Sequence, residues 1–346
     1  MSIVFASGSP YEIGQTRGES APELVKLAVA HICGLDGAER YDREKLRIIQ
    51  ERLLTAMPRV VAESIGVAAG AGISEREALA LSVAPDLLSR LPGYCSLVSV
   101  RSDEGTVLAK NLDSDLAMRP LQVIERIRPD EGLEYVHLTT AGAMWTDGGV
   151  NTAGLAMVNA SLLPADTNPA GYPDGIVTRE MLRECSTVAE AIDFARGTPT
   201  MTFGENLLIA DATGRITNLQ LMPHGVAVND DEPIACCNHP ADAFLLTQMA
   251  QDDPIAANSR RRLDRLRTEL SRASSEPPVA RSSSLLGSVV QTGDSGLFTI
   301  AQLLLQVEQC SLGFARAGSS TDEAPSGLEW TDLGEWPPTR VGTMQP

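Results

Sequence analysis

Two short runs in the first third of the chain bring together residues whose side chains can do chemistry. Cys95 begins the alternating run CSLVSV, and a second run, TVLAKN, leads toward Asp113. Four of the five residues between the runs, SDEG at 102–105, are typical of a hairpin turn. With this turn centred between residues 103 and 104, Cys95 lies opposite Leu112 and within reach of Asn111 and Asp113. The sequence therefore predicts a thiol, an amide and a carboxylate together at the open end of a hairpin.

A thiol is a useful nucleophile only as the thiolate, so a base must lie close to Cys95. The chain has four histidines. His31 falls on an apolar helical face, where a packed core histidine is the commoner outcome. His137 and His224 have no cysteine beside them in the sequence. A cysteine–histidine pair therefore cannot be assigned from the sequence.

An α-amino group is the other base that the sequence offers. Its ordinary pKa lies near 8, so it can accept a proton close to neutral pH. If the Tyr94–Cys95 bond is cut, Cys95 becomes N-terminal and its own amine can take the thiol proton, as an N-terminal threonine does in related devices. A thiol beside a strained peptide can make this cut by attacking the preceding carbonyl. Asp113 would then stabilise the new ammonium group.

The elements that must position these residues can be read from hydrophobic periodicity. Residues 10–91 have the spacing of helices, with a capping box at Ser74-x-x-Glu77 and a break at Pro58. Beyond the first hairpin, strands are expected at 122–128, 134–140 and 155–161, helices at 174–186, 187–197, 258–273 and 299–309, a second hairpin at 206–222, and an exposed loop at 274–284. The order is a helical front, strands, a central helix pair, strands and a final helix.

Composition and charge narrow the class of protein. The 346 residues are 43% hydrophobic with a net charge of −17, which argues against nucleic acid or anionic membranes as partners. No apolar stretch approaches the roughly 18 residues of a membrane span, and the first residues lack a signal-peptide pattern. Six cysteines are too few for a disulfide framework in so long a chain. A cytoplasmic location is therefore expected.

The sequence CCNH at 236–239 contains ligands of the kind that zinc prefers. No second cysteine or histidine pair lies at finger-like spacing, so we expect no metal site. The catalysis outlined above requires no cofactor.

Further motifs occur along the chain in an order that resembles one enzyme family. They are GSPYEIGQTRGE (8–19), GYCSL (93–97), AKNLDSD (109–115), GVNTAGLAMVNAS (149–161), the helix pair at 174–199, the strand pair at 205–221, CCNHPADAF (236–244) and SRRRLDRL (259–266). Together they resemble the self-processing acyl-coenzyme A:6-aminopenicillanic acid acyltransferase family. That family is related more distantly to bile salt hydrolases and acid ceramidase, all of them N-terminal-nucleophile enzymes. The likeness runs from about residue 8 to 270.

This resemblance implies an α+β fold, a four-layer αββα sandwich with the nucleophile at the start of a central strand. It implies that Cys95 is the nucleophile and that Asp113 is the partner of its amine. By the same resemblance, Asn238 supplies an oxyanion donor, Asn159 helps to hold the tetrahedral centre, and Arg262 supports the nucleophile.

The chain departs from the family pattern at several of these positions. Tyr94 stands where the acyltransferase has glycine before the cut, and Ser96 replaces the usual threonine. Lys110, a supporting residue with Asn111, occupies the place where bile salt hydrolases carry an arginine. Gln220 stands where a carboxylate is usual.

Ordinary structural roles compete with the functional ones. A single cysteine at a strand start is often a buried hydrophobe, and Asn159 and Asn238 can simply satisfy backbone groups. Arg262 belongs to a run of arginines that can form a solvated basic face.

The expected organisation is a helical segment, 1–94, that is released at Cys95 but stays associated, a catalytic segment, 95–317, and a polar tail, 318–346. The enzyme would cleave a small acyl amide, a peptide-like substrate or a thioester, and pass the acyl group to water or an amine. A coenzyme A thioester is one candidate acyl donor, and an oligomer is compatible with the sequence. The alternative is an inactive family member that binds a small molecule.

Overall fold

Two β-sheets form the centre of the computed structural model, which describes residues 3–34, 38–88, 94–168, 170–198, 201–230, 235–249, 254–293, 297–317 and 327–333. The first sheet has the strand order β1-β4-β5-β6-β7-β8-β9-β10 and the second has β11-β2-β3-β12-β13-β14. The strands of the first sheet are β1 (Ile3–Gly8), β4 (Gln122–Pro129), β5 (Tyr135–Thr140), β6 (Gly148–Asn151), β7 (Ala156–Ser161), β8 (Glu205–Ala210), β9 (Ile216–Met222) and β10 (Gly225–Asn229). Those of the second are β2 (Ser96–Ser102), β3 (Gly105–Ser114), β11 (Ala235–Cys236), β12 (Phe298–Gln306), β13 (Ser311–Arg316) and β14 (Glu329–Asp332).

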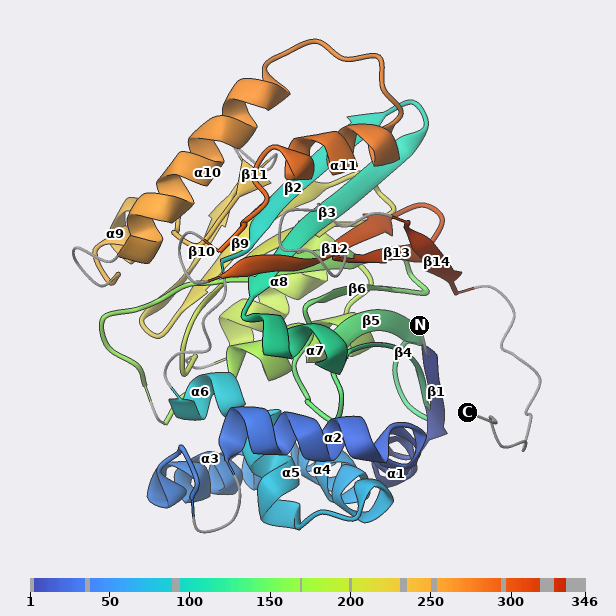
Figure 1. Ribbon diagram of the computed structural model, residues 1–346, viewed down its shortest axis with the longest axis vertical. Coiled ribbons are helices and arrows are strands. Elements are labelled where there is room, and N and C mark those ends of the chain that lie inside the picture. The colour runs from blue at the N-terminus through green and yellow to red at the C-terminus, as the bar shows by residue number, and fades with distance from the viewer. Residues whose placement is uncertain are drawn as a thin grey trace.

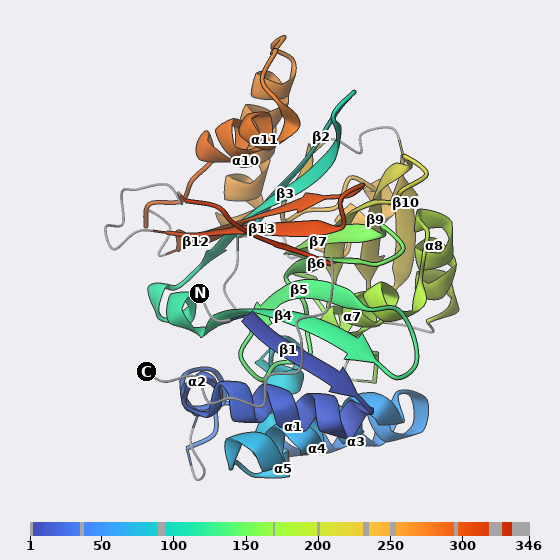
Figure 2. The ribbon, with the colours of Figure 1, turned by 90° about the vertical axis from the view of Figure 1, so that its right-hand side faces the viewer.

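Helices cover the outer faces of both sheets (Figures 1 and 2). Apolar side chains of α7 (Asp174–Glu184) and α8 (Val188–Gly197) pack against one face of the first sheet. Those of α10 (Pro254–Leu270) and α11 (Pro278–Gly287) pack against the outer face of the second. The facing sides of the two sheets enclose the main core. Alternate residues of a strand thus face either the core between the sheets or the core under a helix layer. The αββα sandwich predicted from the sequence is confirmed.

The first hairpin has the register that its turn predicts. Strands β2 and β3 pair antiparallel, with Ser96 opposite Asn111, Leu97 opposite Lys110 and Ser102 opposite Gly105. Two residues before Ser96, the Tyr94 N–H donates to the Asp113 carbonyl oxygen over 3.2 Å. Cys95 therefore lies at the start of the hairpin, at the level that the turn predicts.

The segment before Cys95 is mainly helical and forms a layer below the sheets in Figure 1. Its elements are α1 (Pro10–Ser20), α2 (Pro22–Ala28), a π-helical turn (Val29–Cys33), α3 (Arg43–Ala56), α4 (Pro58–Ala71), α5 (Glu75–Ser82) and α6 (Ala84–Leu88). The break at Pro58 and the capping box of Ser74 and Glu77 are confirmed. Strand β1 was not predicted, and it pairs in parallel with β4 at the edge of the first sheet.

Helices α1 and α4 cross with their backbones in close contact. An added Cβ at Gly14 would lie 1.9 Å from the Glu63 carbonyl oxygen, and one at Gly66 would lie 2.2 Å from the Tyr11 carbonyl oxygen. Gly18 and Gly70 complete two small-residue pairs, each spaced by four positions. Only residues without a side chain permit so close an approach, and this explains the glycines in the motif at 8–19.

Two elements near the C-terminus differ from the sequence-based prediction. The expected helix at 299–309 is strand β12, which pairs with β3 on one side and β13 on the other. Because it is buried on both faces, its sequence is almost continuously apolar, and such a run carries no period that separates strand from helix. Helix α11 replaces the second half of the loop expected at 274–284, and β14 lies within the expected tail. The remaining short elements are the 3₁₀ turn at Leu116–Leu121 and α9 (Ala243–Leu246).

In the part of the chain that is described, no single helix has both the length and the apolar composition needed to cross a membrane. Helices α3 and α4 have the required length and apolar composition only when taken together, and the pair is bent by 119° at its break.

Candidate active site

Cys95 is held through the two peptide groups that flank its side chain. Its N–H donates to Asn238 Oδ1 over 2.9 Å, and its carbonyl oxygen accepts from Arg262 Nη1 over 2.6 Å. Asn238 follows strand β11, which pairs with β2, and Arg262 projects from α10 across the outer face of the sheet. These two partners lie 143 and 167 positions after Cys95 in the chain. The fold brings all three together.

Arg262 belongs to the site and not to a solvated basic face. Its guanidinium also donates to Ser96 Oγ over 2.8 Å and to Asn238 Oδ1 over 2.8 Å. Its Nε donates to Asn258 Oδ1 over 2.6 Å, and its Cζ lies 5.7 Å from the centre of the Tyr94 ring. Arg262 is 4% exposed, whereas the side chain of Arg265 on the same helix is 54% exposed. The side chain that faces the sheet is therefore the one the family pattern selects.

A cavity of about 90 Å³ opens beside the Cys95 side chain. It lies at the ends of strands from both sheets and beside the start of α7, and Cys95, Lys110, Asp113 and Asn159 all line it. The other lining residues are Pro85, Leu112, Ser114, Met118, Gln122, Thr140, Trp145, Thr146, Asp147, Ser161, Asp174, Gly175, Phe203, Glu205 and Ile300. The structure thus brings four of the expected site residues to one cavity.

Lys110 is buried in this cavity and fully hydrogen-bonded. Its Nζ donates to the carbonyl oxygen and Oδ1 of Asp147, each over 3.0 Å, and to Asn159 Oδ1 over 2.7 Å. Burial alone would lower the pKa of Lys110, but attraction to Asp147, Cys95 and Glu205 raises it overall. Lys110 therefore carries a fixed positive charge near the thiol.

Asn159 is fixed by its neighbours. Its Nδ2 donates to the Thr146 carbonyl oxygen and to Glu205 Oε1, both over 2.8 Å. Both amide protons are engaged, and the amide oxygen accepts from Lys110. Asn159 therefore holds Lys110 in place, and its two amide protons are directed at Thr146 and Glu205.

Asp113 has one satisfied and one free oxygen. Oδ1 accepts from Thr299 Oγ1 over 2.6 Å, while Oδ2 is buried and has no hydrogen-bond partner among the described residues. Burial raises the pKa of Asp113 to about 7, against the opposing effects of Arg262, Thr299 and Lys110. An oxygen with this pKa can accept or release a proton near neutral pH.

The thiol itself is protonated in the uncut chain. Burial raises the pKa of Cys95 above its ordinary value, Asp113 and Asp147 add to the rise, and Lys110 opposes it. Reaction at Cys95 therefore depends on an acceptor for the thiol proton.

The structure places Asn111 away from the cavity. Its Nδ2 donates to the Leu286 carbonyl oxygen in α11, over 2.9 Å, on the outer face of the second sheet. Side chains alternate along β3, so Asn111 faces the helices while its neighbours Lys110 and Leu112 face the cavity. Asp113 also lines the cavity, although it lies two positions after Asn111 on β3. At this point the pairing of β3 with β12 is irregular, because its register shifts between Thr299, opposite Asp113, and Ala301.

Three residues of the site were not predicted from the sequence. Thr299 lies in the strand that was expected to be a helix, Asp147 has no motif around it, and Glu205 begins the motif at 205–221 but was assigned no role. Glu205 accepts from Asn159 and from Thr178 Oγ1, the latter over 2.6 Å. A signal did exist for Glu205, since a carboxylate at the start of an apolar strand needs partners.

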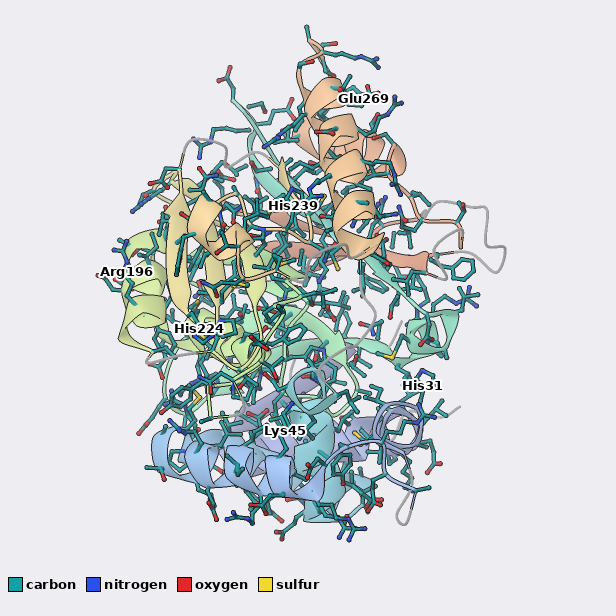
Figure 3. All side chains as sticks on the ribbon, turned by 90° about the vertical axis from the view of Figure 1, so that its left-hand side faces the viewer. His31, Lys45, Arg196, His224, His239 and Glu269 are labelled. Atoms are coloured by element: carbon teal, nitrogen blue, oxygen red, sulfur yellow. The ribbon has the colours of Figure 1, made fainter. Side chains whose placement is uncertain are left out.

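None of the four histidines lines the cavity, although all four are described. His31, His224 and His239 lie in separate parts of the molecule (Figure 3). His31 is partly exposed and lies 3.3 Å from Asp115 Oδ2, instead of packing in a core. His137 is buried against Glu125, with 3.2 Å between Nε2 and Oε2. A histidine base for Cys95 is not provided by this geometry.

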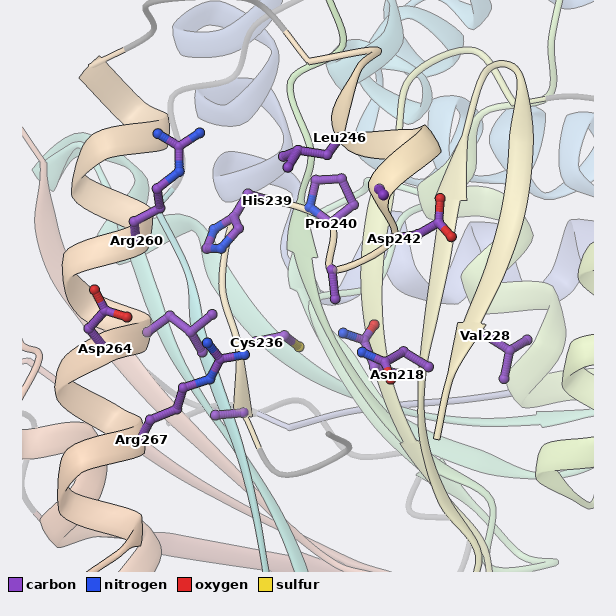
Figure 4. Close-up of a pocket in the computed structure, with 15 residues that line it drawn as sticks. Asn218, Val228, Cys236, His239, Pro240, Asp242, Leu246, Arg260, Asp264 and Arg267 are labelled. Carbon is purple, nitrogen blue, oxygen red and sulfur yellow. The ribbon is translucent and has the colours of Figure 1, made fainter. Parts of the chain in front are cut away.

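A wider cleft, of about 750 Å³, lies beside α10 (Figure 4). Arg260, Asp264 and Arg267 of α10 line it, together with Cys236 and His239. Cys95 and Lys110 are not among its lining residues. We therefore place the reaction at the smaller cavity, because that one contains the thiol.

Several solved structures have a similar fold. A mutant of the conjugated bile acid hydrolase from Clostridium perfringens matches with a TM-score of 0.51 and 12% identity, over 69% of this chain and 92% of that one. A second variant of that hydrolase gives a TM-score of 0.53 with the same identity and coverage. Penicillin V acylase from Agrobacterium tumefaciens gives 0.48 at 14% identity, over 69% and 86%. The bile acid hydrolase matches show that the chain has the N-terminal-nucleophile hydrolase fold.

The family follows from the sequence profile. The profile of the family described as Acyl-coenzyme A:6-aminopenicillanic acid acyl-transferase matches residues 100–293, more than half of the chain. The chain belongs to this family, as the motifs indicated. The match begins after Cys95, so this residue lies outside it. No curated protein sequence gives a significant match. Family and fold together indicate an enzyme of the amide-hydrolase and acyl-transferase kind.

Proposed function

We propose that the protein is a self-cleaving cysteine N-terminal-nucleophile enzyme that acts on an amide or thioester. The observation that carries this proposal is the fixation of Cys95 by Asn238 and Arg262 at a strand start, beside a cavity that contains Lys110 and Asp113. Cys95, Asp113, Asn238 and Arg262 each stand at a motif position of the family, whereas Lys110 departs from the pattern. Any buried residue must pair its peptide N–H and C=O, but at Cys95 side chains from distant parts of the chain make these bonds instead of a neighbouring strand.

The first reaction is the cut between Tyr94 and Cys95. Cys95 Sγ attacks the Tyr94 carbonyl carbon, and Asp113 Oδ2, the unpartnered oxygen in the same cavity, accepts the thiol proton. The peptide C–N bond breaks as its nitrogen takes up a proton, which leaves a thioester to Tyr94 and a free amine on Cys95. Water then hydrolyses the thioester and releases the Tyr94 carboxyl group and the Cys95 thiol.

In the processed enzyme the new amine is the base. It takes the thiol proton, Asp113 stabilises the resulting ammonium, and the thiolate attacks the substrate carbonyl. Asn238, which already contacts the peptide N–H of Cys95, is assigned the oxyanion donor, and Asn159 positions Lys110. The leaving amine or thiol departs with a proton, and an acyl-Cys95 thioester remains. Water or an acceptor amine then takes the acyl group, with no cofactor required.

The test is the intact mass of freshly purified protein under denaturing conditions, beside the Cys95→Ala variant. We expect fragments of 94 and 252 residues from the wild type and a single chain from the variant. A single chain from both would contradict processing and would favour the alternative, a binding protein with the family fold.

Hydrolysis and transfer are separated by a second measurement. The processed enzyme is acylated with an amide or with a coenzyme A thioester, and an amine acceptor is added at increasing concentration. Transfer predicts that an N-acylated acceptor forms at the expense of the free acid. Hydrolysis predicts that the product ratio does not change.

A further inference from the structure

The cavity beside Cys95 contains unpartnered polar atoms of a single kind. Among the described residues, Asp113 Oδ2 and Gln122 Oε1 are lining atoms that are buried without a hydrogen-bond partner, and the buried Asp174 Oδ1 has no partner other than the neighbouring carboxyl group of Asp86. All three are acceptors, and the three residues are at most 4% exposed. Gln122 is fixed in this orientation because its Nε2 donates to Thr140 Oγ1 over 3.2 Å and to the Met118 carbonyl oxygen over 3.4 Å. Buried acceptors without partners are costly unless a ligand satisfies them.

The positively charged group of the cavity has no proton left for a ligand. All three N–H groups of Lys110 are directed at Asp147 and Asn159. Its charge is balanced by the adjacent Asp147 carboxylate. The cavity therefore offers an anionic substrate group neither a free ammonium proton nor a net positive charge, and burying an unpaired carboxylate there would be unfavourable.

Asp174 supplies a negative charge that Lys110 does not neutralise. It is the first residue of α7 and lies close to Asp86 of α6. Burial raises the pKa of Asp86 well above its ordinary range, and the neighbouring Asp174 adds to the rise, so Asp86 is the member of the pair that holds a proton more firmly. Burial raises the pKa of Asp174 only to about 6. Of the two carboxyl groups, Asp174 is therefore the one that carries the negative charge.

The size and walls of the cavity limit what can enter. Its volume of about 90 Å³ is smaller than the roughly 150 Å³ cavity that accommodates benzene. Trp145 and Phe203 provide aromatic walls, and aromatic rings beside a carboxylate favour a small cation. Asp113 is reserved for the amine of Cys95 under the proposed function. Gln122 and Asp174 remain for the substrate.

We propose that this cavity binds a short acyl group carrying a primary ammonium, as in the amide of a small amino acid, with Asp174 and Gln122 accepting its N–H protons. This inference rests on the proposed function, since it takes the acyl group to be the part that lies beside Cys95. The chemistry at Cys95 is unchanged by it. The ammonium group is bound and does not react.

Binding can be measured without catalysis on the uncut Cys95→Ala chain. The probes are glycinamide and propionamide, which have the same number of non-hydrogen atoms and differ by an ammonium in place of a methyl group. At pH 7 glycinamide is mostly protonated, because an α-amino group has a pKa near 8. We expect glycinamide to bind at least ten-fold more tightly by calorimetry or NMR titration. Equal binding, or tighter binding of propionamide, would overturn the proposal.

Two carboxylate variants assign the site. In the Cys95→Ala background, Asp174→Asn should remove the preference for glycinamide, although Asp113 is still present. Asp86→Asn is the matched control, since it changes the other member of the same acid pair but not a lining residue of the cavity. It should keep the preference. Loss of the preference in both variants, or in neither, would contradict a direct contact with Asp174.

Turnover by the wild type separates this inference from the proposed function. Glycyl and propionyl p-nitroanilides are compared, and acylation of Cys95 is followed by mass. We expect kcat/KM for the glycyl substrate to be at least ten-fold higher. If both substrates acylate Cys95 equally, the inference is wrong and the proposed function stands. If neither acylates Cys95 and the chain is uncut, the proposed function fails, and the binding experiment still decides the preference of the cavity.

Discussion

At Cys95, hydrogen bonds hold the backbone more firmly than the thiol. The N–H and the carbonyl group are both fixed, by Asn238 and Arg262, while the side chain faces a cavity. Under the proposed function, such an arrangement would fix the direction of attack before any substrate arrives, which is a large part of what a catalytic site contributes. Arg262 contributes more than Asn238 to fixing Cys95, because its single guanidinium contacts Cys95, Ser96 and Asn238 at once.

The fork shape of Arg262 predicts a mutational effect. Lysine keeps the charge but cannot make the same set of hydrogen bonds. Losing one charge-assisted bond costs about 1.5–3 kcal/mol, so Arg262→Lys should slow self-cleavage roughly ten- to a hundred-fold, measured by the mass of newly made chain over time. Arg265→Lys is the matched control on the same helix, since Arg265 is exposed and pairs with Glu269. Equal cleavage rates in the two variants would argue against a positioning role.

Asp113 predicts a pH dependence of stability in the uncut chain. Its pKa rises from 3.8 to about 7 on folding because the carboxylate is buried. Between these values the folded chain retains a proton that the unfolded chain releases, so this contribution to stability falls as pH rises from about 4 to 7. The slope from one such group is at most about 1.4 kcal/mol per pH unit.

The measurement compares Cys95→Ala with the double variant Cys95→Ala, Asp113→Asn in urea unfolding from pH 4 to 8. Asp86, Asp174 and Glu205 also have raised pKa values. They contribute the same trend to both chains, so the difference between the chains isolates Asp113. We expect the double variant to lose less stability as pH rises. Parallel curves would rule out the raised pKa.

Among the elements, the crossing of α1 and α4 is the tightest contact between helices that the glycine geometry reveals. Gly66→Ala places a methyl group against the Tyr11 carbonyl oxygen, which the backbone can avoid only by moving the helices apart. We expect a loss of about 1–3 kcal/mol in the free energy of unfolding, measured in urea. Gly197→Ala is the control, because an added Cβ there meets nothing within 4 Å. It should be neutral or slightly stabilising, and a similar loss in both variants would contradict the steric argument.

The elements also show how far sequence reasoning reaches. The hairpin of β2 and β3 was predictable to the residue because its turn fixes the register. Strand β12 was not predictable, since burial on both faces removes the alternation of apolar and polar residues that identifies a strand. This error also concealed Thr299, the partner of Asp113. The prediction for Asn111 was wrong because residues close along a strand need not be close in space, since alternate side chains point to opposite faces.

At the scale of the molecule, a buried ionic network joins the N-terminal segment to the rest. Arg17 of α1 contacts Glu63 of α4 over 2.8 Å and Glu125 of β4 over 2.7 Å. Arg179 of α7 contacts Glu63 over 2.6 Å, and His137 of β5 contacts Glu125. Four of these five residues are at most 3% exposed, and Glu63 is 7% exposed. The network crosses the proposed cut and would hold the two fragments together.

Breaking this network should be strongly destabilising. Arg17→Met leaves Glu63 and Glu125 without one partner each, and the loss of one member of a buried pair costs roughly 3–5 kcal/mol. The urea midpoint should fall accordingly. Arg47→Met, on the exposed face of α3, removes surface pairs with Glu44 and Glu51 and should cost less than about 1 kcal/mol. Similar midpoints for the two variants would contradict the importance of burial.

Strand β1 gives the proposed cut a consequence beyond activation. It belongs to the first fragment, yet it forms the edge of a sheet whose other strands belong to the second. Before the cut, unfolding and refolding are unimolecular. Afterwards they involve two separate chains, so the melting temperature should rise with protein concentration, and dilution of unfolded material should slow or prevent recovery. The cleaved protein would then be a heterodimer that can assemble efficiently only once, while its halves are still one chain.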